Sequence, residues 1–443
     1  MSTMTHSFLY MFKKRFVKVG LIVILCLFVL MICGPSIYDI QPSKHPVFSE
    51  LDTREYSIKV HRSVVQEFYE NRQFWPNSKL GAILFKREPI PDPNPNENRT
   101  FMILVWKHWE WLKKRHVENF GKASEEDILS GCSVTNCQFT GEDSKIDTAD
   151  AVIVHLQKGD IPHVENRNPD QRWIYLTDES PRNSFSLSRT KYDSESLQDI
   201  FNWSMTYRSD ADVPVPYGRT IGYDEPIMES FGLNDIPSLI PYWEQKQKEV
   251  PATILMSNCA VKARNEVLAE LKKYVKVDVY GGCSDVLEHK NSCPGHFKAD
   301  CDPISTYLFY LVLENSNCFQ YLTEKVFYNA YSKGAVPIIY GPSKADCETL
   351  LPPNSYLYID KMANVEDIAK EVLMLSENIE LYLSMHLWRN NFQIVNEHGY
   401  FGTKSYHLCR ICEALNYNDG CKKVYSKVDI DWYLNSTLTC KRM

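Results

Sequence analysis

Short, continuous apolar runs that alternate with helical patterns are the feature that most constrains the fold. In the second half of the chain these runs are residues 252–256, 277–281, 307–313 and 336–341. Runs without polar alternation are typical of parallel strands covered on both faces. Helical patterns at 261–274 and 324–333 separate them, and Gly334 marks the expected end of the second helix. The pattern predicts βαβ units and an α/β fold.

A similar texture begins near residue 100. Its expected strands are residues 101–106, 151–156 and 173–176. Prolines punctuate residues 235–250, so we expect two α/β domains, at 99–240 and 250–412. Helical patterns at 364–377 and 379–392 complete the second domain.

The N-terminal region predicts a membrane anchor. An uncharged apolar run from Val19 to Cys33 follows a basic cluster, and with its flanks it approaches the roughly 20 residues that span a bilayer. Basic residues on its N-terminal side favour a cytoplasmic tail at 1–15, an anchor at 16–34 and a lumenal remainder. A cleaved signal peptide is the alternative, but the small-residue cleavage pattern is missing.

The segment 35–98 is polar and rich in proline, which predicts an extended stem. A helix-like patch from Val64 to Trp75 is the exception. The segment 413–443 is expected to be a C-terminal tail that contains disulfides.

Twelve of the 14 cysteines lie beyond the apolar run, an even number that favours disulfides in the secretory lumen. A zinc site formed by Cys409, Cys412, Cys421 and Cys440 is the alternative, but the second pair lacks tight spacing. The pairing of the cysteines stays open.

Three sequons, at Asn98, Asn202 and Asn435, predict glycan acceptors in the lumen. The chain has 49 Lys and Arg against 56 Asp and Glu, a net charge of −7. Without a basic excess, nucleic acid is excluded as a partner.

The loop 313–325 leaves one expected strand and enters the next helix, where ligands of open parallel sheets bind. Thr323 and the helix N-terminus suit an anion, and Lys325 adds a positive charge for a pyrophosphate. Glu324 suits sugar hydroxyls. The alternative is a Glu–Lys pair that only decorates a helix start.

Two other strand ends carry candidate groups. After the strand 252–256, Ser257, Asn258 and Arg264 repeat this arrangement, and Arg264 is a second candidate phosphate ligand. The alternative is that Arg264 is a solvated helix residue. After the strand 173–176, Glu179 is placed to act as a base, although acidic turns are frequent.

A divalent metal at Asp210 and Asp212 is a further alternative. The two carboxylates lack a strong partner ligand nearby, and the two-domain layout favours a site without metal.

Five ordered segments resemble the α1,3-fucosyltransferase family, over roughly residues 100 to 412. They are residues 149–155, 172–181, 201–218, 254–264 and 314–341. The resemblance implies a GT-B fold, with two Rossmann-like domains facing across a cleft after a transmembrane helix and stem. The first domain would hold acceptor and base, and the second GDP-fucose.

The resemblance also implies residue roles. Glu179 is similar to the family's general base, Arg264 and Lys325 to its diphosphate ligands, and Glu324 to a carboxylate that contacts the donor. Ser257, Asn258, Asn315 and Tyr321 are expected to line the donor pocket. Tyr207 and Arg208 are expected in the cleft between the domains.

The chain departs from the family pattern at three positions. Gln320 stands where Asp is common, Ser209 where a basic residue is frequent, and Ala211 where Ser is usual. None of these changes removes an expected catalytic group, but they bear on acceptor choice and rate.

The activity implied is inverting transfer of L-fucose from GDP-fucose to the 3-hydroxyl of N-acetylglucosamine on N-linked glycans. No cofactor is expected to be required, with Mn²⁺ at most a stimulant, and no metal site is assigned. The implied location is the Golgi membrane, as a single-pass type II protein. The alternatives are a GT-B transferase for another nucleotide sugar and a non-catalytic lumenal glycan-binding relative.

Overall fold

The computed structural model describes residues 58–91, 99–107, 128–295, 300–418 and 423–441. The expected cytoplasmic tail and the anchor at 16–34 lie outside these residues. Within the described ranges, no helix combines the length and the apolar character needed to cross a bilayer.

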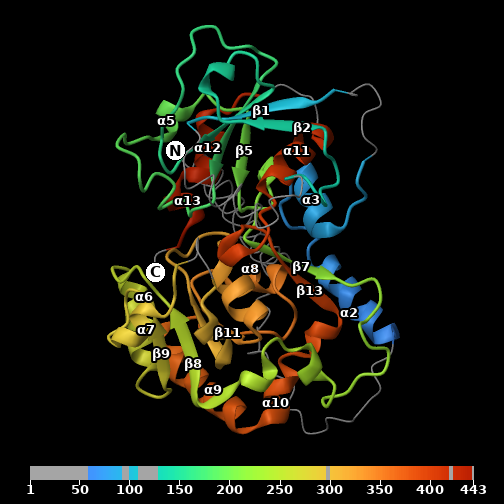
Figure 1. Ribbon diagram of the computed structural model, residues 1–443, viewed down its shortest axis with the longest axis vertical. Coiled ribbons are helices and arrows are strands. Elements are labelled where there is room, and N and C mark those ends of the chain that lie inside the picture. Colours follow the sequence, from blue (N-terminus) through green and yellow to red (C-terminus); the bar gives the residue numbers. More distant parts are fainter. Residues whose placement is uncertain (1–57, 92–98, 108–127, 296–299, 419–422, 442–443) are drawn as a thin grey trace, which may run out of the picture. The chain divides into compact units, whose positions relative to one another are not determined.

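Residues 99–240 contain a six-stranded parallel sheet, as expected for an α/β fold (Figure 1). Its strand order is β2-β1-β3-β4-β5-β6. The strands are β1 (Phe101–Val105), β2 (Cys137–Thr140), β3 (Ala151–His155), β4 (Arg172–Thr177), β5 (Trp203–Thr206) and β6 (Val213–Pro214). A short helix, α5 (Ser194–Leu197), precedes β5.

The second sheet has five parallel strands in the order β12-β11-β10-β8-β9. They are β8 (Gln247–Leu255), β9 (Val277–Tyr280), β10 (Tyr307–Leu313), β11 (Val336–Tyr340) and β12 (Leu357–Tyr358). Its helices are α6 (Lys262–Leu271), α7 (Leu287–Asn291), α8 (Lys344–Leu350), α9 (Val365–Glu377) and α10 (Ile379–Ser384). Every residue of β10 is buried, which explains its unbroken apolar sequence.

The strand order of the second sheet creates a switch point between β8 and β10. From β8 the chain proceeds to β9 on one side, and then returns to β10 on the other side of β8. Loops that leave the carboxyl ends of two such strands diverge and form a crevice, the usual ligand site of this architecture. The candidate donor residues follow these two strands.

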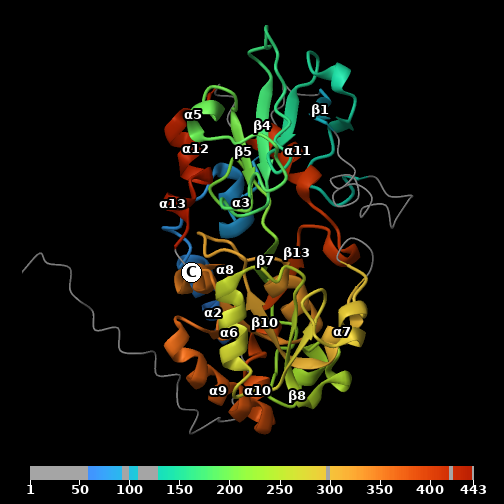
Figure 2. The same ribbon diagram turned by 90° about the vertical axis from the view of Figure 1, so that its left-hand side faces the viewer.

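The C-terminal segment returns to the first sheet, which corrects the expected end of the second domain at residue 412. Leu408 and Ile411 of α11 (His407–Tyr417) share a core with Ile103 and Ile174. Both views show α11 beside the first sheet (Figures 1 and 2). Apolar periodicity predicts a helix but does not show which sheet it covers.

Residues beyond α11 also pack on the first sheet. Ile430 of α12 (Lys427–Leu434) lies in a core with Val152 and Tyr175, and α13 (Ser436–Thr439) follows. A two-stranded antiparallel sheet pairs β7 (Gly218–Gly222) with β13 (Phe392–Asn396). The helix expected at 379–392 is therefore too long, because α10 ends at Ser384 and Phe392 already belongs to β13.

Part of the expected stem belongs to the globule. Within 35–98, the chain forms α2 (Ile58–Glu70) and α3 (Lys79–Lys86). Phe68 of α2 packs edge-on against Phe392, with ring centroids 4.7 Å apart, and Leu80 of α3 is fully buried. The helix-like patch predicted at 64–75 overlaps α2. Helix α3 is not predicted, because the proline content of the segment favours an extended stem.

Disulfides, three of which join distant segments, exclude the zinc alternative at three of its four cysteines. The bonds are Cys132–Cys409, Cys137–Cys412, Cys259–Cys283, Cys293–Cys301 and Cys318–Cys440. Cys421 lies outside the described residues, and Cys347 is a buried free thiol.

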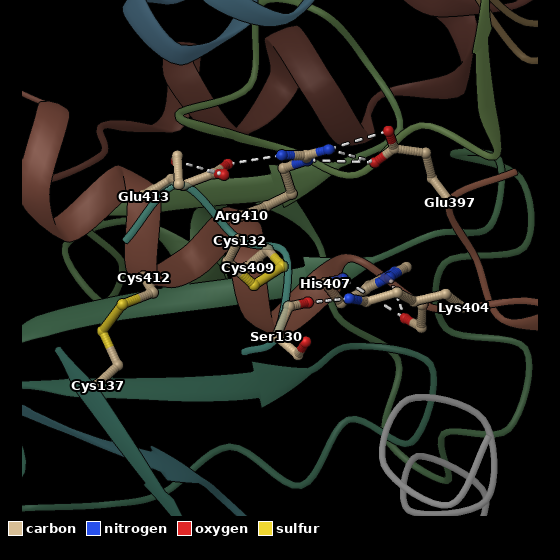
Figure 3. The surroundings of a disulfide bond; sticks show 12 residues. Ser130, Cys132, Cys137, Glu397, Lys404, His407, Cys409, Arg410, Cys412 and Glu413 are labelled. Atoms are coloured by element: carbon tan, nitrogen blue, oxygen red, sulfur yellow. Dashed lines mark hydrogen bonds and ion pairs between the residues drawn. A yellow bond between two sulfur atoms is a disulfide. The ribbon is translucent and has the colours of Figure 1, made fainter. Parts of the chain in front are cut away.

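A buried ion cluster fixes α11 further (Figure 3). Arg410 lies between Glu397, at 2.9 Å, and Glu413, at 2.7 Å. Arg219 of β7 also pairs with Glu397, at 2.6 Å. The segment between β13 and α11 is therefore held at both ends.

Candidate functional site

The Lys325 ammonium lies among oxygen atoms at the end of β10. It begins η7 (Lys325–Ala330), and its Nζ lies 3.0 Å from Glu314 Oε2 and 3.2 Å from Glu324 Oε1. It also donates to Thr323 Oγ1 at 2.8 Å. Burial lowers its pKa, but the two carboxylates outweigh burial and raise the pKa above its ordinary value. Lys325 therefore stays cationic.

Glu314 is the residue that the sequence reasoning missed. Its side chain is fully buried, and Oε1 accepts from Thr323 N at 3.0 Å and from Thr323 Oγ1 at 2.8 Å. The Thr323 amide, expected to face a donor phosphate, is thus bonded to a carboxylate. Gly341, at φ +132°, allows this packing, because a Cβ there would lie 3.2 Å from the Glu314 Cβ. As the first polar residue after seven buried ones, Glu314 marks the strand's carboxyl end.

The helix expected at 324–333 is irregular. Residues Lys325–Ala330 form a π-helix and Tyr331–Lys333 a 3₁₀-helix, instead of one α-helix. Gly334 ends it in the left-handed conformation, at φ 69°, as predicted. π-Helical turns are rare in proteins, and those that do occur are often found at functional sites.

Arg264 is buried, contrary to the solvated alternative. Its side chain, on α6, is 5% exposed, and its charge acts on Lys325 to lower that residue's pKa. The Arg264 Nε is buried and has no hydrogen-bond partner within the described part of the chain. Buried polar groups are almost always bonded, so an unbonded buried donor on a cation that acts on a second cation favours an anionic ligand at this place.

Ser257 and Asn258 lie on the exposed loop between β8 and α6. Asn258 Oδ1 accepts from Ala260 N at 3.1 Å, and the Cys259–Cys283 disulfide ties the loop to the one after β9. The two residues thus lie at the carboxyl end of β8, on the loop that leads to Arg264.

Glu179 meets the loop that follows β10. This half-buried residue follows β4, and its Oε2 accepts from Tyr321 OH at 3.1 Å and from Asn315 Nδ2 at 3.5 Å. Next to it, Ser180 Oγ donates to Ser316 Oγ at 2.8 Å. Glu179, which follows a strand of the first sheet, is therefore in contact with the loop that follows β10 of the second sheet.

Tyr321 connects the acid with the cationic group. Burial, followed by the charges of Glu179, Glu314 and Glu324, raises the pKa of its hydroxyl well above the ordinary value. One side chain is thus within electrostatic reach of all three carboxylates. Tyr207 packs edge-on against Tyr321 with ring centroids 5.0 Å apart, so the structure places both predicted tyrosines beside Glu179.

Arg208, expected in the cleft, lies over the Phe319 ring of the loop that follows β10, with Cζ 5.1 Å from the ring centroid. Its guanidinium pairs with both Asp210 oxygens, at 2.9 and 2.6 Å, and donates to the Trp432 carbonyl at 2.6 Å. Asp212 in turn pairs with Lys423 at 2.5 Å. The carboxylates of Asp210 and Asp212, considered above as a metal site, are thus both paired with basic side chains.

Two of the departures from the family pattern contact each other. Gln320 Oε1 accepts from Ser209 N at 2.8 Å, and Gln320 Nε2 donates to Ser209 Oγ at 2.9 Å. Both residues are buried. A neutral pair therefore joins the loops after β5 and β10, where the family pattern has charged residues.

The structure argues against a glycan at Asn202. This residue is 5% exposed, its Oδ1 accepts from Trp173 N at 2.8 Å, and its Nδ2 donates to the Lys423 carbonyl at 2.7 Å. The nitrogen that would carry a glycan is therefore used inside the fold. Asn435 is half-buried at the N-cap of α13 and stays a prediction, and Asn98 lies outside the described residues.

Comparison with known proteins decides the family. A model described as glycosyltransferase family 10 (fucosyltransferase) C-term matches residues 243–432, and one described as fucosyltransferase, N-terminal, matches residues 98–218. The mouse alpha-(1,3)-fucosyltransferase 4 is 30% identical over 387 residues, which cover 78% of this chain and 82% of that protein. The chain belongs to glycosyltransferase family 10. The family resemblance of its motifs is thereby confirmed.

Other relatives extend the comparison. The Drosophila melanogaster glycoprotein 3-alpha-L-fucosyltransferase A is 28% identical over 320 residues, 71% of this chain, and the chain spans only 58% of that relative's length. Two crystal structures of alpha1,3-fucosyltransferase, the second with GDP-fucose, are 14% and 15% identical. Both matches cover 77% of this chain and 98% of the solved chain, with TM-scores of 0.42 and 0.44. Family membership makes the chain a glycosyltransferase.

Proposed function

We propose that the chain is an inverting α1,3-fucosyltransferase with a GT-B arrangement. It moves L-fucose from GDP-fucose to the 3-hydroxyl of N-acetylglucosamine on N-linked glycans. The observation that carries this proposal is the 3.1 Å hydrogen bond from Tyr321 to Glu179, which brings a carboxylate of the first sheet to the loop that also leads to Lys325.

Arg264 and Lys325 bind the donor diphosphate in this account. Together with Glu314 and Glu324, they carry a formal charge of zero, so a diphosphate dianion needs one carboxylate to move away. Glu324 is 22% exposed whereas Glu314 is fully buried, so Glu324 is the group that moves. Glu324 then accepts a hydrogen bond from a donor hydroxyl, and Lys325 turns to phosphate.

Glu179 acts as the base. Its carboxylate accepts the proton of the acceptor 3-hydroxyl while that oxygen attacks C1 of fucose. The C1–O bond to GDP breaks, its electron pair leaves with the diphosphate, and the configuration at C1 inverts. Lys325 and Arg264 stabilise the negative charge that develops on the diphosphate.

The cellular setting belongs to the same proposal. The anchor at 16–34 holds the chain in the Golgi membrane in type II orientation, with the catalytic part in the lumen. Five disulfides support an oxidising compartment. The two cations stabilise the leaving group, so no metal is proposed at the diphosphate, and Mn²⁺ acts there at most as a stimulant.

Donor binding and transfer test the proposal separately. Calorimetric titration with GDP-fucose and with UDP-sugars should give binding of GDP-fucose and no binding of UDP-sugars. Incubation with GDP-fucose and a glycan array, followed by linkage mapping, should give fucose on the 3-hydroxyl of N-acetylglucosamine. Binding of a UDP-sugar alone would identify another transferase. Binding of GDP-fucose without transfer or hydrolysis would identify a non-catalytic relative.

A further inference from the structure

Three buried side chains from distant parts of the chain converge beside the proposed base. Asp178 follows β4, His398 follows β13 and His407 begins α11, and they are 1%, 2% and 2% exposed. Each offers a ligand atom, and the three atoms lie within 4.8 Å of one another. None of the three has a role in the proposed transfer.

Hydrogen bonds on the outer side of the cluster orient both rings. His398 Nε2 lies 2.9 Å from the Val215 carbonyl, which only accepts, so Nε2 carries a hydrogen and Nδ1 is the candidate ligand atom. His407 Nδ1 lies 3.0 Å from Ser405 Oγ, which can accept its hydrogen and leave the lone pair on Nε2. Metal-binding histidines show this pattern, in which the second ring nitrogen donates to a nearby oxygen.

The cluster offers one carboxylate oxygen and two imidazole nitrogens as candidate ligand atoms in a buried place. A proton bridges only two of these atoms, whereas a divalent metal bonds to all three. We propose that Asp178, His398 and His407 bind one divalent metal ion of the zinc class. Two nitrogens and one carboxylate oxygen form a ligand set that zinc prefers, and three protein ligands leave a fourth position for water. With bonds of about 2.1 Å, tetrahedral ligand atoms lie ~3.4 Å apart, so binding draws the three groups inward.

The metal fixes the loop that carries Glu179, the next residue after Asp178. Tyr217 OH donates to the Asp178 carbonyl at 2.8 Å, and its ring lies 3.8 Å from the His398 ring, measured between centroids. The same Tyr217 ring lies 6.2 Å from that of Tyr321, which bonds to Glu179. The cluster thus connects the base loop to the start of α11, where Figure 3 shows His407 close to the Cys132–Cys409 disulfide. This positioning role rests on the proposed function, whereas metal binding does not.

Metal content tests the site directly. The full chain, purified without metal-affinity resin or chelator, should contain about one equivalent of zinc by elemental analysis. His398→Asn and His407→Asn should reduce the zinc to background. The matched control is His61→Asn, because His61 is also buried and hydrogen-bonded, to Asn391 Oδ1, but lies outside the cluster. Zinc in the two cluster variants equal to that in the control would overturn the proposal.

A measurement on the unmodified chain covers the case in which those variants fail to fold. After zinc removal by a chelator, addition of Co²⁺ should produce visible absorption that saturates at one equivalent, and Zn²⁺ should abolish it. The thermal midpoint should fall on chelation and recover with Zn²⁺. A chain without zinc, with no Co²⁺ absorption and an unchanged midpoint, would show that a proton bridges the cluster.

Activity then tests the positioning role alone. Chelation should lower kcat at least tenfold and leave the GDP-fucose KM unchanged, with recovery on Zn²⁺. If zinc binds at this cluster but kcat does not change on its removal, the positioning role is wrong while the metal site stands.

Discussion

The two sides of the candidate site are built in different ways. Lys325 is surrounded by groups of its own loop, and Glu314 and Glu324 compensate its charge. Glu179 depends on the other sheet, because Tyr321 and Asn315, which bond to its carboxylate, belong to the loop after β10. The cationic side is thus preorganised within one half of the fold, whereas contact between the halves places the acid.

This difference has an energetic consequence. A buried ion pair is costly to break, because the remaining charge stays buried without compensation. A half-buried carboxylate that accepts hydrogen bonds from neutral donors, as Glu179 does from Tyr321 and Asn315, is more easily replaced. Changes on the cationic side should therefore affect folding and donor binding together, whereas changes on the acid side should affect catalysis alone.

The largest effect is expected from Lys325→Met, which leaves Glu314 buried without its cation. It should lower the free energy of unfolding by about 3–5 kcal/mol, measured by urea denaturation, and abolish GDP binding. The double variant Lys325→Met, Glu314→Gln should recover most of the stability but no GDP binding. Lys333→Met, which breaks the ion pair of another buried lysine, with Asp300, is the matched control and should lower stability only. Full GDP affinity in the double variant would remove Lys325 from the donor site.

Glu179→Gln should reduce kcat by about 10²–10⁴-fold, because glutamine keeps the shape of the side chain but cannot take the proton. GDP-fucose affinity by calorimetry and the thermal midpoint should not change. Glu165→Gln, at an exposed position before β4, should behave as the unmodified chain. Retained transfer in Glu179→Gln would exclude this residue as the base.

Arg264→Ala should weaken GDP binding by about 10- to 150-fold, the loss of ~1.5–3 kcal/mol expected for hydrogen bonds to a charged group. The loss should concern binding more than folding, because the buried Nε has no hydrogen-bond partner among the described residues. Lys262→Ala, on the same helix with a side chain 89% exposed, should leave GDP affinity unchanged. Equal GDP affinities in the two variants would contradict the role given to Arg264.

Tyr321→Phe is expected to have the smallest effect. It removes one hydrogen bond to Glu179, worth about 0.5–1.5 kcal/mol, so kcat should fall by roughly two- to tenfold with donor KM unchanged. Tyr417→Phe, which removes a bond to Ser133 instead, should leave kcat intact. A changed donor KM in Tyr321→Phe would show that the tyrosine serves the donor side.

The sequence predicts the parts of the fold that local pattern determines. The apolar run at 307–313 and the stop at Gly334 are both confirmed, because burial on both faces and a left-handed φ impose them. The same reasoning located the loop 313–325 at the carboxyl end of β10.

The remaining features depend on contacts between residues that are distant in the sequence. The burial of Glu314 depends on the close approach of Gly341, and the hydrogen bond from Arg208 to Trp432 depends on the packing of α12. Nothing in the sequence near residue 407 indicates that α11 covers the first sheet. The convergence of Asp178 with two histidines more than 200 residues away likewise comes only from the fold.

A crystal structure of the full chain with GDP and an N-acetylglucosamine acceptor tests the central claim most directly. The account predicts diphosphate oxygens within about 3 Å of Lys325 Nζ and of the Arg264 guanidinium. It also predicts a Glu179 oxygen within hydrogen-bond distance of the acceptor 3-hydroxyl. A diphosphate bound away from both cations, or a Glu179 carboxylate turned away from the acceptor, would contradict it.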